Sequence, residues 1–143
     1  MAQPQSVGEI MRREFVSLQA SDHLDFVEDV MSLGRIRHLP VVDNGKLVGI
    51  VSHRDLLANS LSRAIDFDAK DRRTFLRSVD VSEAMSRNVI TVQRQTPIDE
   101  AARLMLRHRV GCLPVVNEDG APIGLVTETD LIRAAYLGEG EDA

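Results

Sequence analysis

Two polar pairs recur at the same spacing in this chain. Ser52 lies three residues before Asp55, and Thr127 lies three residues before Asp130. Each pair belongs to a repeated phrase, "GIVSHRDL" and later "GLVTETDL", in which apolar residues precede the hydroxyl. A hydroxyl at that place is expected to follow a buried strand and to open a helix. Free N–H groups and the helix dipole at such an opening can hold a phosphate.

Helix capping is the simpler interpretation of the same residues. A Ser or Thr at a helix start accepts a backbone N–H bond, which stabilises the helix by about 1 kcal/mol. An Asp three residues later interacts favourably with the positive end of the helix. The pairs Asp22/Asp25 and Thr96/Asp99 repeat this spacing with no ligand implied. On the spacing alone, capping and ligand binding both stay open.

Glycine and proline within the expected strands favour a ligand. Gly49 and Gly124 lie in strand-like runs, where glycine often marks the close approach of another group. Pro40 and Pro114 also lie in strand-like runs, which predicts an edge or a bulge with some unpaired backbone. Those unpaired groups could hydrogen-bond to a ligand.

The two phrases are part of a longer repeat. "VGEIM", which starts at Val7, corresponds to "VSEAM" at Val81, and "HLPVV" corresponds to "CLPVV". Agreement over about 50 residues is far more specific than one short motif. We therefore expect a first domain over 7–58, a partly helical linker over 59–80 and a second domain over 81–137.

Each half predicts the order strand, helix, strand, strand, helix, which is an α/β (α+β) fold of two pseudo-symmetric repeats. Because each repeat is too small to bury both faces of its sheet, we expect the repeats to pack sheet to sheet. The expected elements are the first strands (Phe15–Leu18 and Val89–Val92), the first helices (about Asp25–Leu33, started by Asp22, and Asp99–Leu106, started by Thr96-Pro97), the hairpins around Asn44-Gly45 and Asp119-Gly120, and the final helices from Ser52 and Thr127.

Composition excludes several classes of protein. With 43% hydrophobic residues in 143, the chain can bury a core. A net charge of -5 and 3% aromatic residues argue against nucleic-acid binding. No run approaches the roughly 18 apolar residues of a membrane span. The single Cys112, the absence of zinc spacing and the lack of a secretory signal favour a cytoplasmic protein without a metal site.

The openings "VGEIM"/"VSEAM", the strands "HLPVV"/"CLPVV" and the phrases "GIVSHRDL"/"GLVTETDL" resemble the cystathionine-β-synthase (CBS) domain family in its tandem form, the Bateman module. The resemblance implies two CBS repeats that bind adenosine-containing ligands, such as AMP, ADP, ATP or S-adenosylmethionine, at two sites between the repeats. It also implies a homodimer that regulates another protein. Since no catalytic domain accompanies the repeats, that partner would be a separate chain, and no cofactor is required.

The resemblance also implies which residues bind the ligand. Asp55 and Asp130 would accept hydrogen bonds from the two ribose hydroxyls, because two carboxylate oxygens suit a vicinal diol. Ser52 and Thr127 would donate to phosphate. The adenine would lie against residues of the first strand and of the Pro-Val strand, which are Val16, Ser17 and Val41 in one half and Ile90, Thr91 and Val115 in the other.

The two copies differ between the hydroxyl and the Asp. His53-Arg54 stands in the first copy, where Arg54 could attract a di- or triphosphate. Glu128-Thr129 stands in the second, where Glu128 would discourage extra phosphate or favour a cationic ligand. Other arginines could also reach a phosphate, although solvated salt bridges are the better expectation for them: Arg12, Arg13, Arg35, Arg37, Arg107 and Arg109.

Other function classes are weaker. The sequence has no nucleophile elbow, no P-loop and no metal triad, so we do not expect an enzyme. The alternative to ligand sensing is a ligand-free structural module for dimerisation or protein interaction, which would use apolar faces left after the repeats have paired.

Overall fold

The computed structural model describes residues 4–61 and 69–137, and the chain divides into two compact units. The unit of Val16–Asn88 is called here the repeat-1 unit. The repeat-2 unit comprises Met1–Phe15 together with Val89–Ala143. The first residues of the chain therefore pack with the second repeat, and the opening of the second repeat packs with the first.

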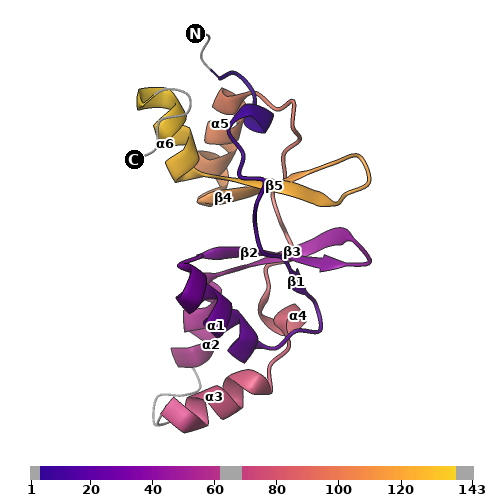
Figure 1. The fold of residues 1–143 in the computed structure, drawn as a ribbon, viewed down its shortest axis with the longest axis vertical. Coiled ribbons are helices and arrows are strands. Elements are labelled where there is room, and N and C mark those ends of the chain that lie inside the picture. Colours follow the sequence, from indigo (N-terminus) through magenta and orange to yellow (C-terminus); the bar gives the residue numbers. More distant parts are fainter. Residues whose placement is uncertain (1–3, 62–68, 138–143) are drawn as a thin grey trace. The chain divides into compact units, whose positions relative to one another are not determined.

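The repeat-1 unit is a three-stranded sheet with helices α1 and α2 on one face (Figure 1). The central strand pairs in parallel with the first strand through Leu18 and Val41, and it is antiparallel to the third. The elements are β1 (Leu18–Gln19), α1 (Leu24–Gly34), β2 (His38–Asp43), β3 (Lys46–Ser52), α2 (His53–Leu61), α3 (Ala69–Arg77) and α4 (Val81–Ala84).

The repeat-2 unit repeats this plan with one strand fewer. Val92 stands where β1 would be and makes a single parallel bridge to Val115. Helices α5 and α6 cover one face of the two-stranded sheet (Figure 1). The elements are a short 3-10 helix η1 (Val7–Glu9), α5 (Ile98–His108), β4 (Cys112–Val116), β5 (Pro122–Thr127) and α6 (Glu128–Tyr136).

The α/β fold class and the order of elements are confirmed. Asn44 and Gly45 both have positive φ, 53° and 78°, as the tight turn between β2 and β3 requires. A bulge follows each strand proline, between Val41 and Val42 and between Val115 and Val116. None of the helices within 4–61 and 69–137 has the length and apolar character that crossing a membrane requires.

Two expectations about the start of each repeat are wrong. The first strands are shorter than predicted, since β1 is two residues long and the second is a single bridge. The helices begin within one residue of the predicted starts, but the predicted capping residues are wrong: the N-caps are His23 and Pro97, and neither makes a side-chain cap bond. Asp22 and Thr96 instead accept the backbone N–H groups of Gln19 and Gln93, at 2.8 Å and 3.0 Å. They close the turn ahead of each helix.

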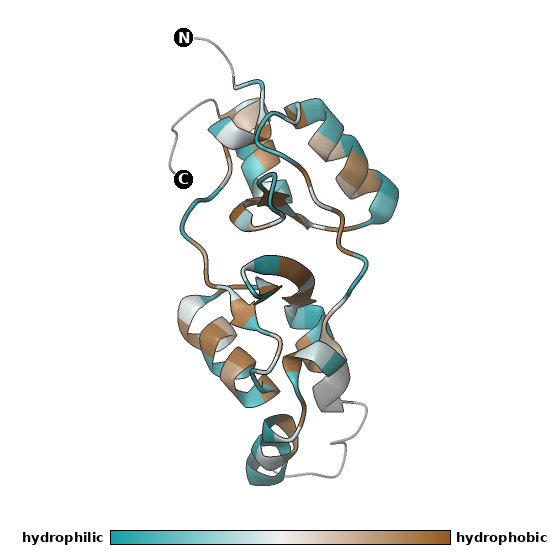
Figure 2. Ribbon diagram, turned by 90° about the vertical axis from the view of Figure 1, so that its right-hand side faces the viewer, coloured by the Kyte–Doolittle hydropathy of each residue, from teal (hydrophilic) through white to brown (hydrophobic). Residues whose placement is uncertain are grey.

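Each unit has its own hydrophobic core, and in each the core is completed by residues from outside the repeat. In the repeat-1 unit, Leu76, Val81 and Met85 pack with residues of the sheet and of α1. In the repeat-2 unit, Val7 and Met11 do the same. The hydropathy colouring shows the strands of both units and one stripe of each long helix as apolar (Figure 2).

The strand glycines belong to this packing. A Cβ on Gly49 would clash with the side chain of Met85, and a Cβ on Gly124 would clash with that of Met11. The prediction that these glycines mark a close approach is thus confirmed, but the approaching group is a methionine of the chain itself. The reason to infer a ligand from these two glycines falls away.

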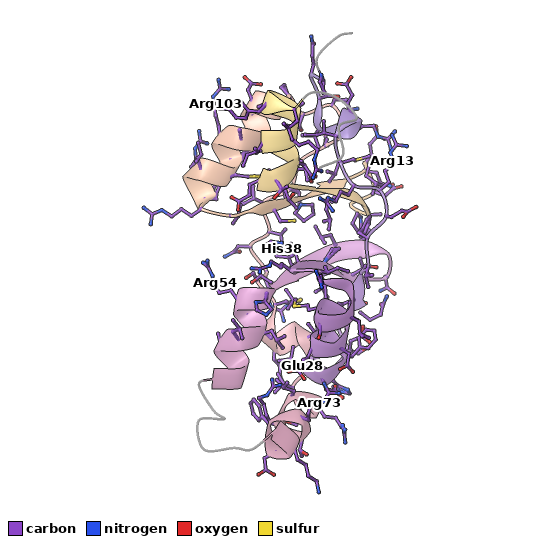
Figure 3. All side chains as sticks on the ribbon, turned by 60° about the vertical axis from the view of Figure 1, so that its left-hand side comes forward. Arg13, Glu28, His38, Arg54, Arg73 and Arg103 are labelled. Atoms are coloured by element: carbon purple, nitrogen blue, oxygen red, sulfur yellow. The ribbon has the colours of Figure 1, made fainter. Side chains whose placement is uncertain are left out.

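Helix α3, which lies within the predicted linker, docks on α1 through ion pairs (Figure 3). Arg73 donates to Glu28 at 2.7 Å and to Asp29 at 3.0 Å. Arg72 also pairs with Glu28, and Arg77 lies 3.5 Å from Asp25. The hydrogen bonds from Arg73 to Glu28 and Asp29 raise the pKa of that guanidinium. The predicted linker, 59–80, also includes the last turn of α2, which extends to Leu61, and its residues 62–68 lie outside the described residues.

The docked segment predicts a clear stability effect. Leu76 is 0% exposed in the repeat-1 core, so Leu76→Ala should lower the free energy of unfolding by about 2–5 kcal/mol. Leu33 on α1 is 87% exposed, and Leu33→Ala should change stability by less than about 0.5 kcal/mol. Urea denaturation of the two variants measures the difference. Equal stabilities would mean that α3 is not part of this core.

Candidate functional site

The phrase at the start of α2 forms a capping box. The Asp55 Oδ2 atom accepts from the Ser52 backbone N–H at 2.8 Å and from the Ser52 hydroxyl at 3.0 Å. The Asp55 N–H returns a bond to the Ser52 hydroxyl at 3.1 Å. The residues of this phrase therefore cap the helix, as the simpler interpretation predicted. It fixes the carboxylate in one orientation at the end of β3.

The phrase at the start of α6 forms the same box. Asp130 Oδ2 accepts from the Thr127 N–H at 2.8 Å and from the Thr127 hydroxyl at 2.9 Å, while the Asp130 N–H donates to that hydroxyl at 3.3 Å. In both boxes the hydroxyl proton goes to the neighbouring carboxylate. A phosphate could receive that proton only if the hydroxyl turned away from the cap.

The pairs with the same spacing at the first helices behave differently. Asp25 lies against Arg77 of α3, and Asp99 bonds Arg103 one turn along α5 at 3.1 Å. Neither helix start has a side-chain cap bond. The reciprocal box is therefore a property of the repeated phrase at α2 and α6, and the spacing by itself does not produce it.

Asp130 is more enclosed than Asp55. Its exposed fraction is 5%, whereas Asp55 is half-buried. Its second oxygen, Oδ1, accepts from the Nε of Arg12 at 3.2 Å and lies 3.9 Å from Nη1 of Arg133. The sequence analysis treated Arg12 as one of several surface arginines. Arg12 directly follows the repeated opening motif, and the equivalent residue of the second repeat is Ser86. This difference between the repeats is the sequence feature that could have distinguished Arg12 from the other arginines.

Each compact unit contains one complete set of the predicted ligand residues. In both sets the first segment lies beside the Pro-Val strand, through the pairs Leu18–Val41 and Val92–Val115. Val41 and Val115 are wholly buried in the cores, main chain included, so neither is accessible to a ligand in this structure. The repeat-1 unit holds Val16, Ser17, Val41, Ser52, Arg54 and Asp55, and the repeat-2 unit holds Ile90, Thr91, Val115, Thr127 and Asp130.

Three of the predicted arginines lie at helix ends. Arg54 is exposed in the first turn of α2 and extends away from the helix (Figure 3). Arg35 and Arg109 end α1 and α5 in the left-handed conformation, with φ of 53° and 55°. They are C-cap residues whose backbone N–H groups bond Met31 and Met105, a role that the sequence analysis missed because glycine is the usual residue there.

Cys112 occupies the position of His38 beside the second capping box. It pairs with Thr127 across the hairpin and is buried. Burial raises the pKa of the Cys112 thiol to about 12, and the negative charge of Asp130 adds to the effect. The thiol is therefore a small apolar side chain at neutral pH and not a nucleophile.

Both repeats of this chain match a known protein family. The CBS domain family model matches residues 7–62 and 81–137. A CBS domain-containing protein of Dictyostelium discoideum is 36% identical over 127 residues, which are 88% of this chain and 88% of that protein. This chain therefore belongs to the CBS domain family and carries a pair of CBS domains.

Solved structures of CBS domain pairs have the same fold. CBSX2 in complex with AMP has a TM-score of 0.78 and 29% identity, covering 94% of this chain and 98% of that chain. The CBS domain pair of protein MJ0100, in complex with 5'-methylthioadenosine and S-adenosyl-L-methionine, has a TM-score of 0.73 and 27% identity, covering 92% and 95%.

Relatives that carry enzyme names are longer proteins. The chain is 33% identical to a homoserine O-acetyltransferase of Methanocorpusculum labreanum, but it spans only 25% of that protein's length. The matched part is the CBS pair. An enzyme name on such a relative therefore does not transfer to this chain.

The raised pKa of Cys112 predicts its reactivity. An ordinary thiol has a pKa near 8.5, so at pH 8 the shift reduces the thiolate fraction on the order of a thousandfold. The native protein should resist iodoacetamide for hours at pH 8, and raising the pH toward 12 should restore reactivity. Intact-mass measurement follows the alkylation, with urea-unfolded protein as control. Equal rates for native and unfolded protein would contradict the buried thiol.

Proposed function

We propose that this protein is a ligand-sensing regulatory module, in which each unit binds an adenosine-containing nucleotide, AMP, ADP, ATP or S-adenosylmethionine. One observation carries the proposal: in both units a strand ends at a helix whose first turn presents a hydroxyl and an oriented carboxylate. The complexes of CBSX2 with AMP and of MJ0100 with S-adenosyl-L-methionine support the choice of ligand class.

The capping box determines which atoms stay available for a ligand. One carboxylate oxygen stays in the cap, and the other edge of Asp55 or Asp130 accepts hydrogen bonds from the ribose diol. The N–H groups of Ser52, His53 and Asp55 are bonded within the protein. The Arg54 amide in the first turn of α2, with the helix dipole, is then the candidate to bind the phosphate.

The adenine would lie against the first segment and the Pro-Val strand of the same unit. Ser17 and Thr91 are exposed beside these strands. Val41 and Val115 are wholly buried, so they would support the adenine site from behind and would not touch the ring.

Charge near the phosphate makes the two sites prefer different ligands. Arg54, exposed at the start of α2, favours a di- or triphosphate in the repeat-1 unit. Glu128, exposed at the start of α6, disfavours extra phosphate and favours the positive charge of S-adenosylmethionine. Binding shifts the module between conformations only through a difference in affinity, and a tenfold difference supplies about 1.4 kcal/mol. We propose that this shift controls a separate protein.

A ligand-free interaction module is the second candidate. It is favoured by apolar side chains on α5 and α6, where Leu106 and Tyr136 are each 82% exposed and Ile132 is 58% exposed. Such a face suits a second copy of the chain in a homodimer or a partner protein. Sensing and dimerisation are compatible, but only sensing requires the two carboxylates.

The test replaces one carboxylate without removing its cap. Asp55→Asn keeps an oxygen for the Ser52 N–H but loses the charge that a ribose diol needs, so the affinity of the repeat-1 site for AMP should fall at least tenfold. Isothermal titration calorimetry with AMP measures the loss. Asp43→Asn, which changes an exposed carboxylate at the end of β2, is the matched control and should bind as the unaltered protein does.

Melting temperature separates the two candidates. A nucleotide at one hundred times its Kd should stabilise the protein by about 2.7 kcal/mol. An unchanged melting temperature with AMP, ADP, ATP and S-adenosylmethionine would leave the ligand-free module as the function.

A further inference from the structure

We propose that Arg12 controls access to the repeat-2 nucleotide site, by occupying the carboxylate that would bind the ribose there. A nucleoside must then displace the Arg12 side chain to reach Asp130. The inference rests on the proposed function, because it concerns access to the same two carboxylates.

Both oxygens of Asp130 already have donors. Oδ2 accepts from the N–H and the hydroxyl of Thr127, at 2.8 Å and 2.9 Å. Oδ1 accepts from the Arg12 Nε at 3.2 Å and faces Nη1 of Arg133 at 3.9 Å. A ribose diol needs two acceptor positions, and here those of Oδ2 belong to the cap. The diol therefore competes with the arginine for Oδ1.

The main chain holds Arg12 beside the carboxylate. The Arg12 N–H donates to the carbonyl of Leu125 at 2.8 Å, and the Leu125 N–H donates back at 3.0 Å. The preceding residue, Met11, is locked in the repeat-2 core against Gly124. Arg12 itself is 54% exposed, whereas Asp130 is 5% exposed. The guanidinium can thus swing into water without disturbing the core, while its backbone stays in place.

The repeat-1 unit supplies an internal comparison. Ser86 follows Met85 as Arg12 follows Met11, and its main chain makes the same two bonds, to Ile50, at 3.1 Å and 2.9 Å. A serine at this position brings no positive charge toward Asp55. The residue that corresponds to Arg133 on α6 is Ala58 on α2. The two arginines that face Asp130 therefore have uncharged residues at the equivalent positions of the repeat-1 unit.

The expected consequence is weaker nucleoside binding at the repeat-2 site. A ligand without phosphate gains nothing from Arg12 and must break its ion pair with Asp130. Part-exposed ion pairs contribute modestly, so the repeat-2 site should bind adenosine about threefold to tenfold more weakly than it would without Arg12.

Adenosine is the probe, because it carries no phosphate that Arg12 could bind. Titrations are made in the Asp55→Asn background, where the repeat-2 site dominates the signal. Arg12→Ser, which copies the residue found in repeat 1, should raise adenosine affinity about threefold to tenfold. Arg13→Ser changes the adjacent exposed arginine and should leave affinity unchanged. Equal or weaker adenosine binding by Arg12→Ser would overturn the inference.

A ligand-free measurement tests the contact independently. Carboxyl labelling with a water-soluble carbodiimide and glycine ethyl ester, mapped by peptide mass spectrometry, should modify Asp130 more slowly than Asp55. Arg12→Ser should speed labelling of Asp130 severalfold and leave Asp55 unchanged, and Arg12→Lys should keep most of the protection. If Arg12→Ser does not alter the labelling of Asp130, the shielding is wrong whatever the nucleotide data show.

The two measurements separate the inference from the proposed function. Faster labelling of Asp130 in Arg12→Ser, together with tighter adenosine binding, supports the inference. Faster labelling, with no binding of adenosine, AMP, ADP, ATP or S-adenosylmethionine by any variant, would overturn the proposed function. The Arg12–Asp130 contact would then stand without a role in ligand access.

Discussion

The structure depends on the packing of a methionine against a glycine in a neighbouring strand. Met85 lies on Gly49 and Met11 lies on Gly124, and in each case the methionine comes from a segment outside the repeat that it completes. A repeat of this size cannot enclose its own sheet, so the missing apolar surface must come from elsewhere in the chain. Each core therefore receives the opening segment of the other repeat, and in both units that segment places a methionine against a strand glycine.

The same packing determines the polar surroundings of the candidate site. Because Met11 and Met85 are fixed in the cores, the residues that follow them pair with Leu125 of β5 and Ile50 of β3. One of these residues is Arg12 and the other is Ser86. A near-symmetric backbone therefore places an arginine in one unit where the other unit has a serine, and only the arginine bonds a capping carboxylate, that of Asp130.

The capping role of Asp55 and Asp130 is compatible with the ligand-binding role proposed for them. The cap engages one oxygen of Asp55 and of Asp130 with the backbone and hydroxyl of the residue that opens the helix. A carboxylate held in this way loses little conformational entropy when a ligand binds. The absence of such boxes at α1 and α5, where the spacing is the same, suggests that the box is not needed merely to begin a helix in this fold.

The sequence by itself determined the local features of this protein. The duplicated motifs predicted two units, the Asn44-Gly45 pair predicted the turn, and the hydroxyl-x-x-Asp spacing predicted the helix starts at α2 and α6, because these depend on residues close together in the chain. Only the tertiary structure decided which segment completes which core and which charge faces which carboxylate. Arg12 and Asp130 are far apart in sequence, as are Met85 and Gly49, and their contacts follow from packing that no local pattern records.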